Sequence, residues 1–217
     1  GNAVIHIPKA PFIGLTFAVE KKSRKGMKKV IIIGATGSLA QYVIDAVKAL
    51  DNIALTLFTR NKSGLPKSAA EGYTIIEGDA MNYADVKNAV LGQDIVYVNL
   101  AGDLEAMAMN IVKAMKETGV KRIIAISSIG IYITPLKSVL VPYRKLADVV
   151  ESSGLEYTIL RPDWFTNANE INYAKTQKGQ PETGTAISRK SIAAFIATII
   201  EKPELHKNEN LGISKPN

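Results

Sequence analysis

The sequence has no cysteine and only two histidines, His6 and His206, among its 217 residues. Without cysteine there is no disulfide, no thiolate nucleophile and no cysteine metal site, as is usual in a reducing compartment, so we expect a cytoplasmic protein. The two histidines stand near opposite ends of the chain, which predicts neither a histidine-based triad nor a metal site. No apolar run approaches the roughly 18 residues of a membrane-spanning helix, so no membrane partner is expected.

The net charge of +7 is unevenly distributed along the chain. Residues 1–29 contain seven Lys and Arg residues and one Glu, which leaves 20 basic and 19 acidic residues for the rest. A basic segment can contact phosphate groups, but a nearly neutral remainder gives no support for specific nucleic-acid binding. We therefore expect no nucleic-acid partner.

Residues 1–26 precede Met27 and carry much of this positive charge. A secretory signal places its charge before a short apolar stretch, whereas the main basic cluster here follows one. We interpret residues 1–26 as an added extension, or as an ordered arm that lies on a neighbouring molecule. Residues 27–217 have a suitable length for a single domain with a small substrate-side region near its C-terminal end.

The segment from Lys29 to Leu50 is the most informative part of the chain. Val30 to Ile33 is an unbroken β-branched run, typical of a strand buried on both faces, and apolar residues recur at helical spacing from Leu39 onward. A strand, a glycine turn and a helix in this order predict an anion site, because the first N–H groups of the helix are unpaired and glycines let a pyrophosphate approach the backbone. The alternative is an ordinary strand-to-helix turn. The turn consists of Gly34, Ala35, Thr36, Gly37, Ser38, Leu39 and Ala40, spaced G-x-x-G-x-x-A where the usual fingerprint is G-x-G-x-x-G/A.

Strand-like and helix-like segments alternate over the rest of the chain, with Gly119 and Gly154 at expected helix ends and Ser188 as an expected N-cap. This alternation predicts an α/β fold: one doubly wound, mostly parallel sheet with helices on both faces. The expected further strands are 53–58, 73–76, 94–100, 122–127, 157–160 and 212–214, and the expected helices are 83–91, 104–118, 142–153 and a last one ending at Glu201.

The carboxyl ends of the predicted strands carry small, polar or glycine residues, and ligands of such sheets bind at that edge. After the second strand the chain reads Thr59-Arg60-Asn61-Lys62, where an NAD-binding protein would place an acid for the ribose. An arginine can form paired bonds to a 2′-phosphate. We therefore predict a preference for NADP(H) over NAD(H) through Arg60, assisted by Lys62 or Asn61; the alternative is a solvated pair of cations.

These features together resemble the atypical short-chain dehydrogenase/reductase superfamily, in its NmrA-like, NAD(P)H-binding branch. The resemblance runs from about Met27 to Ser214 and rests on the glycine turn, Arg60, residues 78–80, Ser127-Ser128, and the segments 153–162 and 187–193. It implies a Rossmann-like fold.

The resemblance also implies a role for several residues. Gly34, Thr36, Gly37, Ser38 and Leu39 would surround the pyrophosphate of the dinucleotide. Asp79 and Ala80 would flank the adenine, and Leu100, Ala101 and Gly102 would line the ribose side. Ser127 and Ser128 would lie near the nicotinamide, with Trp164 and Phe165 as walls of the substrate pocket, although ordinary packing is an alternative for both aromatic residues.

One departure from the family is the absence of its Tyr-x-x-x-Lys pair, in which the lysine lowers the pKa of the catalytic phenol. The only such spacing is Tyr83/Lys87, too early in the chain for that role, and Tyr143 is followed four residues later by Ala147. Residues 131–141 are also short for this branch, which is consistent with a pocket loop that is missing from the sequence.

The resemblance leads to three hypotheses about function. The first is an NADPH-binding oxidoreductase that passes hydride to a flat acceptor such as a flavin or a quinone, with Ser127, Ser128 and Tyr143 as candidate hydrogen-bonding residues on the acceptor side. The second is a non-catalytic regulatory protein that senses NADP(H). A nucleotide-sugar epimerase or dehydratase is the third, and it is disfavoured because those reactions depend on the missing pair. We expect a monomer or a homodimer.

Overall fold

The computed structural model describes residues 26–66 and 72–217. The proposed extension, residues 1–26, lies outside these residues apart from Gly26. Eight strands form one sheet in the order β3-β2-β1-β4-β5-β6-β10-β8, and all neighbours are parallel except β10 and β8. This arrangement confirms the predicted doubly wound α/β fold. The sheet strands are β1 (Lys28–Ile33), β2 (Ile53–Thr59), β3 (Thr74–Glu77), β4 (Ile95–Val98), β5 (Arg122–Ile126), β6 (Glu156–Pro162), β8 (Ala174–Gln177) and β10 (Glu209–Ser214).

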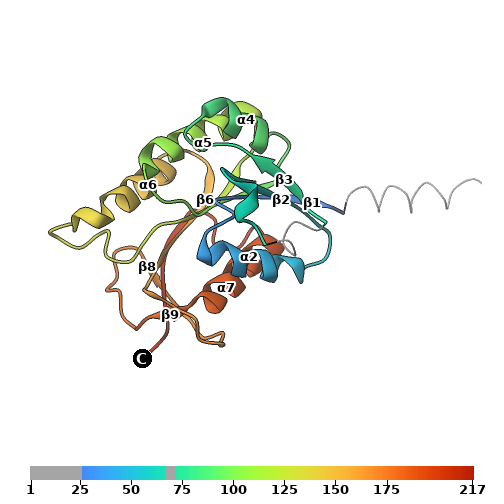
Figure 1. Cartoon of the computed structure of the whole chain (residues 1–217). Helices are drawn as coiled ribbons and strands as arrows, with labels where there is room; N and C mark the ends of the chain where they lie inside the picture. The colour runs from blue at the N-terminus through green and yellow to red at the C-terminus, as the bar shows by residue number, and fades with distance from the viewer. Residues whose placement is uncertain (1–25, 67–71) are drawn as a thin grey trace, which may run out of the picture.

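Five α-helices cover the two faces of this sheet in the described part of the chain. One face carries α2 (Ser38–Lys48) and α7 (Arg189–Glu201), and the other carries α4 (Tyr83–Val90), α5 (Leu104–Thr118) and α6 (Val141–Glu151) (Figure 1). Two 3₁₀ turns, η1 (Lys62–Gly64) and η2 (Ser138–Leu140), lie in loops at the carboxyl side of the sheet. No helix among the described residues is long and apolar enough to cross a membrane.

The apolar run of β1 is central to this architecture. Val30 and Ile32 belong to the core under α2 and α7, whereas Ile31 and Ile33 belong to the core under α4, α5 and α6, and all four are fully buried. Alternate side chains of a strand point to opposite faces, so a strand covered on both sides needs an apolar residue at every position. The unbroken β-branched sequence therefore follows from the position of β1 in the middle of the sheet.

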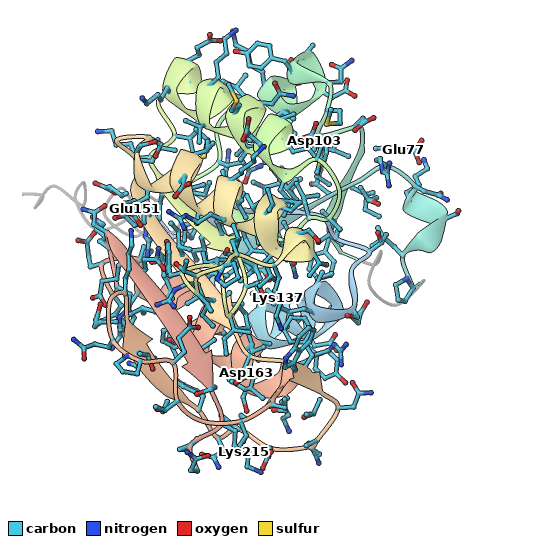
Figure 2. The ribbon with its side chains drawn as sticks, turned by 90° about the vertical axis from the view of Figure 1, so that its left-hand side faces the viewer. Glu77, Asp103, Lys137, Glu151, Asp163 and Lys215 are labelled. Carbon is cyan, nitrogen blue, oxygen red and sulfur yellow. The ribbon has the colours of Figure 1, made fainter. Side chains whose placement is uncertain are left out.

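The strand order reverses between β1 and β4, and ligands of doubly wound sheets bind at such a switch point. Chain segments that follow the strands meet at the carboxyl edge of the sheet. In Figure 2, Glu77 at the end of β3 and Asp103 after β4 lie toward one side, and Glu151 at the far end of α6 lies toward the other.

Three strands were not predicted from the sequence. β7 (Phe165–Thr166) and β9 (Ile187–Ser188) pair as a small separate sheet, and β8 joins the main sheet antiparallel to β10. β8 is largely exposed and has no alternation of apolar and polar residues. β8 thus extends the main sheet at its edge, whereas β7 and β9 pair apart from it.

Candidate functional site

A cleft of about 660 Å³ opens at the switch point, within the size range of small-molecule sites. It lies among the ends of β1, β2 and β4 and the residues after β3. Of the predicted cofactor residues, all but Ala35 line it: Gly34, Thr36, Gly37, Ser38, Leu39, Arg60, Asp79, Ala80, Leu100, Ala101 and Gly102. The side chain of Ala35 is instead buried in the core, and its N–H donates to the carbonyl of Phe58.

The glycine turn leaves the start of α2 open. Gly37 is the N-cap residue, no side chain caps the helix, and no acidic residue stands in its first turn. By contrast, Asn82, Asp103 and Ser188 each accept a hydrogen bond at the start of α4, α5 and α7. The first N–H groups of α2 are therefore available to an anion in the cleft.

Two glycines of the turn serve different purposes. Gly34 has a φ of +97°, and a Cβ there would collide with the backbone carbonyl of Asn99. Gly37 has an ordinary φ of −65°, and its nearest neighbour would be the Gly34 carbonyl oxygen at 3.6 Å. The fold itself requires glycine at position 34, whereas at position 37 it leaves room beside the backbone. An open helix start next to such room fits the diphosphate of a dinucleotide.

Arg60 lies at the end of β2 and lines the cleft with Thr59 and Asn61. Its guanidinium is exposed and makes no hydrogen bond or ion pair with the described residues. Asn61 uses its Oδ1 to accept from the backbone N–H of Ser63 at 3.0 Å. Lys62 is not a lining residue; its N–H donates to a Glu77 carboxylate oxygen at 3.1 Å. Of the predicted basic pair, the structure brings only Arg60 into the cleft.

A second cavity of about 330 Å³ adjoins the cleft, and Tyr143 and Phe165 line both. Ser127 and Ser128 belong to this second cavity rather than to the cleft. The Ser127 hydroxyl donates to the carbonyl of Tyr143 at 2.8 Å, and the Ser128 hydroxyl donates to the carbonyl of Ile129 at 3.0 Å. Both serine protons are therefore committed to the backbone, while Trp164 is 73% exposed at the edge of the cavity.

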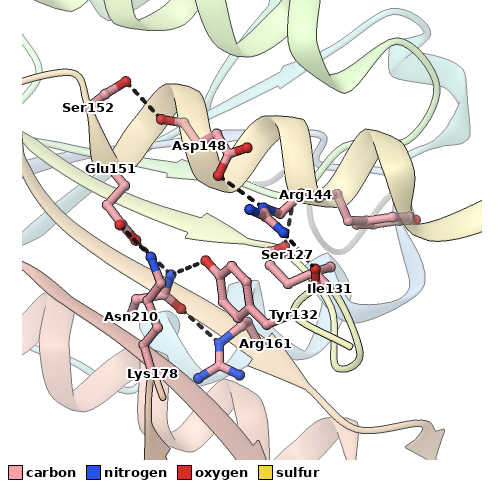
Figure 3. Close-up of polar contacts among 11 residues, drawn as sticks. Ser127, Ile131, Tyr132, Arg144, Asp148, Glu151, Ser152, Arg161, Lys178 and Asn210 are labelled. Carbon is pink, nitrogen blue, oxygen red and sulfur yellow. Dashed lines mark hydrogen bonds and ion pairs between the residues drawn. The ribbon is translucent and has the colours of Figure 1, made fainter. Parts of the chain in front are cut away.

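The loop after Ser128 is anchored by a polar network on the β6 and β10 side of α6 (Figure 3). Tyr132 accepts a hydrogen bond from Asn210 at 2.8 Å, and Asn210 accepts one from the buried Arg161 at 2.8 Å. Arg144 of α6 donates to the carbonyl of Ile131 at 3.2 Å. These contacts anchor the loop that precedes α6, the helix that carries Tyr143.

Tyr83 and Lys87 lie on α4, away from both cavities, and both contact Glu117 of α5. The hydrogen bond to the Glu117 carboxylate raises the pKa of Tyr83 to about 12. A catalytic phenol requires a lowered pKa, so this pair has neither the place nor the electrostatics of the family's dyad.

Arg189 is a site residue that the sequence prediction did not identify. It lines the second cavity, and its Nε donates to the Ser38 hydroxyl oxygen at 3.2 Å. Its segment was noted as typical of the family, but its location depends on the β7/β9 pairing, which two-residue strands do not reveal in a sequence.

Comparison with known proteins identifies the family to which the chain belongs. Residues 34–203 match the family described as NAD(P)H-binding. A Rossmann-fold NAD(P)-binding family protein from Shigella flexneri is 46% identical, with a TM-score of 0.82, and the match covers 88% of this chain and 95% of that one. A short-chain dehydrogenase/reductase from Veillonella parvula, solved in complex with NADP, is 25% identical with a TM-score of 0.79 over the same shares of the two chains.

A plant enzyme is also related: phenylcoumaran benzylic ether reductase IRL1 of Ginkgo biloba is 27% identical over 183 residues, which are 78% of this chain and 58% of that protein. This chain thus spans little more than half the length of that relative. The family match extends over most of the chain and includes the glycine turn, Arg60 and the two cavities. The chain belongs to the NAD(P)H-binding family of Rossmann-fold, oxidoreductase-like proteins.

Proposed function

We propose that this protein is an NADPH-dependent reductase that passes hydride to a flat, electron-poor acceptor such as a flavin or a quinone. The observation that carries the proposal is the connection between the open start of α2 and a second cavity with aromatic walls, through Tyr143 and Phe165. A dinucleotide bound in the cleft supplies the hydride.

The roles of the chain's own residues follow from their positions. The N–H groups at the start of α2 bind the diphosphate, and Tyr143 and Phe165 orient the two reactants at the junction of the cavities. The hydroxyl oxygens of Ser127 and Ser128 can accept a hydrogen bond from an N–H group of a flavin, whereas their own protons are already donated to backbone carbonyls. A flavin or a quinone suits such a site, because solvent can supply the proton that follows the hydride.

The test is consumption of NADPH by the purified full chain with a panel of flavins, quinones and aldehydes. We expect turnover with a flavin or a quinone and none with aldehydes. Tyr143→Phe removes one hydrogen-bonding group and is expected to lower kcat/KM about two- to tenfold. Tyr83→Phe, remote from both cavities, is the matched control and should leave kcat/KM unchanged. Turnover confined to aldehydes would overturn the proposed acceptor class.

A second function is favoured by one observation: among the described residues, no lysine lines either cavity, so the site has no tyrosine–lysine pair, and the serine protons are committed to backbone carbonyls. Such a site also suits a protein that binds NADP(H) and senses its redox state without turnover. Tight binding of NADP⁺ together with no turnover on the whole panel would select this function over the reductase.

The preference for NADPH is part of the proposal and depends on Arg60. Loss of a charge-assisted bond to a 2′-phosphate costs about 1.5–3 kcal/mol, so Arg60→Ala should reduce the ratio of NADPH to NADH affinity at least about tenfold. Lys62→Ala, which removes a neighbouring cation outside the cleft, should leave the ratio unchanged. Dissociation constants from calorimetry measure both. An equal ratio in wild type and Arg60→Ala would exclude this role.

A further inference from the structure

The side chain of Arg189 bridges α7 and α2, the two helices on one face of the sheet. Arg189 lines the second cavity and contacts Ser38, which lines the cleft. It is the first residue of α7, and its guanidinium extends to Ser38, the first residue of α2. Its Nη1 donates to Asn167 Oδ1 at 2.7 Å, and its guanidinium carbon lies 5.1 Å from the centroid of the Phe165 ring. One side chain thus contacts both the glycine turn and the wall of the second cavity.

No carboxylate among the described residues neutralises the charge of Arg189. Its contacts among the described residues are a hydroxyl, an amide oxygen and an aromatic ring, and none is a carboxylate. The start of α2, which Arg189 reaches through Ser38, also has no acid in its first turn. An unpaired guanidinium and an uncapped helix start converge there, and both favour an anion with several oxygens.

The partners of Arg189 on the other side belong to the segment that walls the second cavity. Trp164, Phe165 and Asn167 follow one another around β7, and the N–H of Ile187 donates to the Trp164 carbonyl at 2.8 Å. This backbone hydrogen bond and the contacts of Arg189 therefore link the β7 segment to the start of α7. The guanidinium of Arg189 contacts both Asn167 and Phe165 of this segment.

We propose that Arg189 binds the diphosphate of the dinucleotide and, through Asn167 and Phe165, positions the wall of the acceptor cavity when the cofactor is bound. This inference rests on the proposed function, because it assigns a further residue to the same cofactor site. It predicts that occupation of the cleft changes the surroundings of Trp164, beside Phe165.

The chain offers a direct reporter, since Trp164 is its only tryptophan and is largely exposed. In a titration of the full chain with NADP⁺, tryptophan emission should change with saturation. Arg189→Met should weaken NADP⁺ binding about ten- to a hundredfold, because hydrogen bonds to a charged group are lost, and should remove the emission change at saturating NADP⁺. Lys190→Met, the matched control, removes the neighbouring charge, whose exposed side chain contacts Asn169, and should behave as wild type.

Two further variants separate the two parts of the proposal. Arg189→Lys keeps the charge but not the paired geometry, so it should bind NADP⁺ with intermediate affinity and lack the emission change; it also serves if Arg189→Met does not fold. Asn167→Ala should bind NADP⁺ with affinity close to that of wild type and show a much reduced emission change. A full emission change in Asn167→Ala would show that the nicotinamide acts on Trp164 directly, and would overturn the positioning role.

Adenosine 2′-monophosphate, which lacks the diphosphate, shows whether the effect is specific. Arg189→Met should bind it as wild type does, whereas an equal loss for this probe and for NADP⁺ would contradict a diphosphate contact. If wild type binds no pyridine nucleotide, the proposed function fails. If wild type binds NADP⁺ and Arg189→Met binds it equally well, the proposed function stands and the role of Arg189 is wrong.

Discussion

At the scale of single residues, Gly34 and Gly37 occupy one turn for different physical reasons. Gly34 has a positive φ and lies against the Asn99 carbonyl, so its lack of a side chain is a requirement of the fold. Gly37 has a conformation open to any residue and free space beside it. The sequence predicts both as ligand contacts, because a sequence shows that a glycine is present but not which neighbour excludes a side chain.

This difference predicts opposite outcomes for two alanine substitutions. Gly34→Ala should lower the free energy of unfolding by at least about 2 kcal/mol, through backbone strain and collision. Gly37→Ala should change it by no more than about 1 kcal/mol, yet weaken NADP⁺ binding at least about tenfold, since the methyl group occupies space that the diphosphate needs. Chemical denaturation and calorimetry measure the two quantities. Unchanged NADP⁺ affinity in Gly37→Ala would contradict the proposed diphosphate position.

At the scale of secondary-structure elements, the sequence predicts the helices and strands that have a clear local pattern of apolar residues and caps, and it misses those that lack one. The predicted helix 104–118 agrees with α5, which ends at Gly119 in the left-handed conformation, and the helix after Ser188 agrees with α7. β8 was missed because its four residues, three of them exposed, match no periodic pattern, and its pairing with β10 joins distant parts of the chain. The location of Arg189 was missed for the same reason, because it depends on the pairing of β7 with β9, two strands that are distant in the sequence.

The ends of α6 and β8 are joined by an ion pair between Glu151 and Lys178, with Nζ and Oε1 2.6 Å apart. Burial opposes ionisation of Glu151, but hydrogen bonds from Lys178 and Asn210 outweigh it and hold its pKa below the ordinary 4.5. The bond to Glu151 raises the pKa of Lys178 above 10.5. The pair therefore stabilises the fold at pH values between 4.5 and 10.5, the ordinary pKa values of the two groups. Its contribution is lost as pH falls through the folded pKa of Glu151, or rises through that of Lys178.

Lys178→Met tests this pH dependence. At neutral pH it should lower the free energy of unfolding by no more than about 1 kcal/mol, since both side chains are partly exposed and solvent screens them. The difference from wild type should disappear well below pH 4.5 and well above pH 10.5. Denaturation at a series of pH values measures it, and Lys137→Met, which removes an exposed lysine that forms no ion pair among the described residues, should show no such profile. A difference that stays constant from acid to alkaline pH would exclude the pair as its origin.

At the scale of the whole molecule, the cleft draws on several elements at once. Its walls come from the ends of β1, β2 and β4, the start of α2, Phe165 at the start of β7 and Tyr143 of α6, so they include both layers of helices. A ligand held there contacts groups that are together only in the folded chain. Binding must then stabilise the entire domain rather than one loop, because the unfolded chain has no such site.

This linkage gives a prediction for global unfolding. NADP⁺ at 100 times its dissociation constant should raise the free energy of unfolding by about 2.7 kcal/mol, which for a domain of this size is about 5–10 °C in Tm. Gly37→Ala, at the same NADP⁺ concentration, should lose about half of this increase or more, since a tenfold weaker affinity leaves about 1.4 kcal/mol; its unliganded Tm should stay near that of wild type, because its defect lies in the ligand site and not in the fold. Thermal melts followed by circular dichroism measure both proteins. Gly37 borders the cleft at the start of α2. An equal increase in Tm for the variant and for wild type would therefore mean that NADP⁺ is not held at the start of α2.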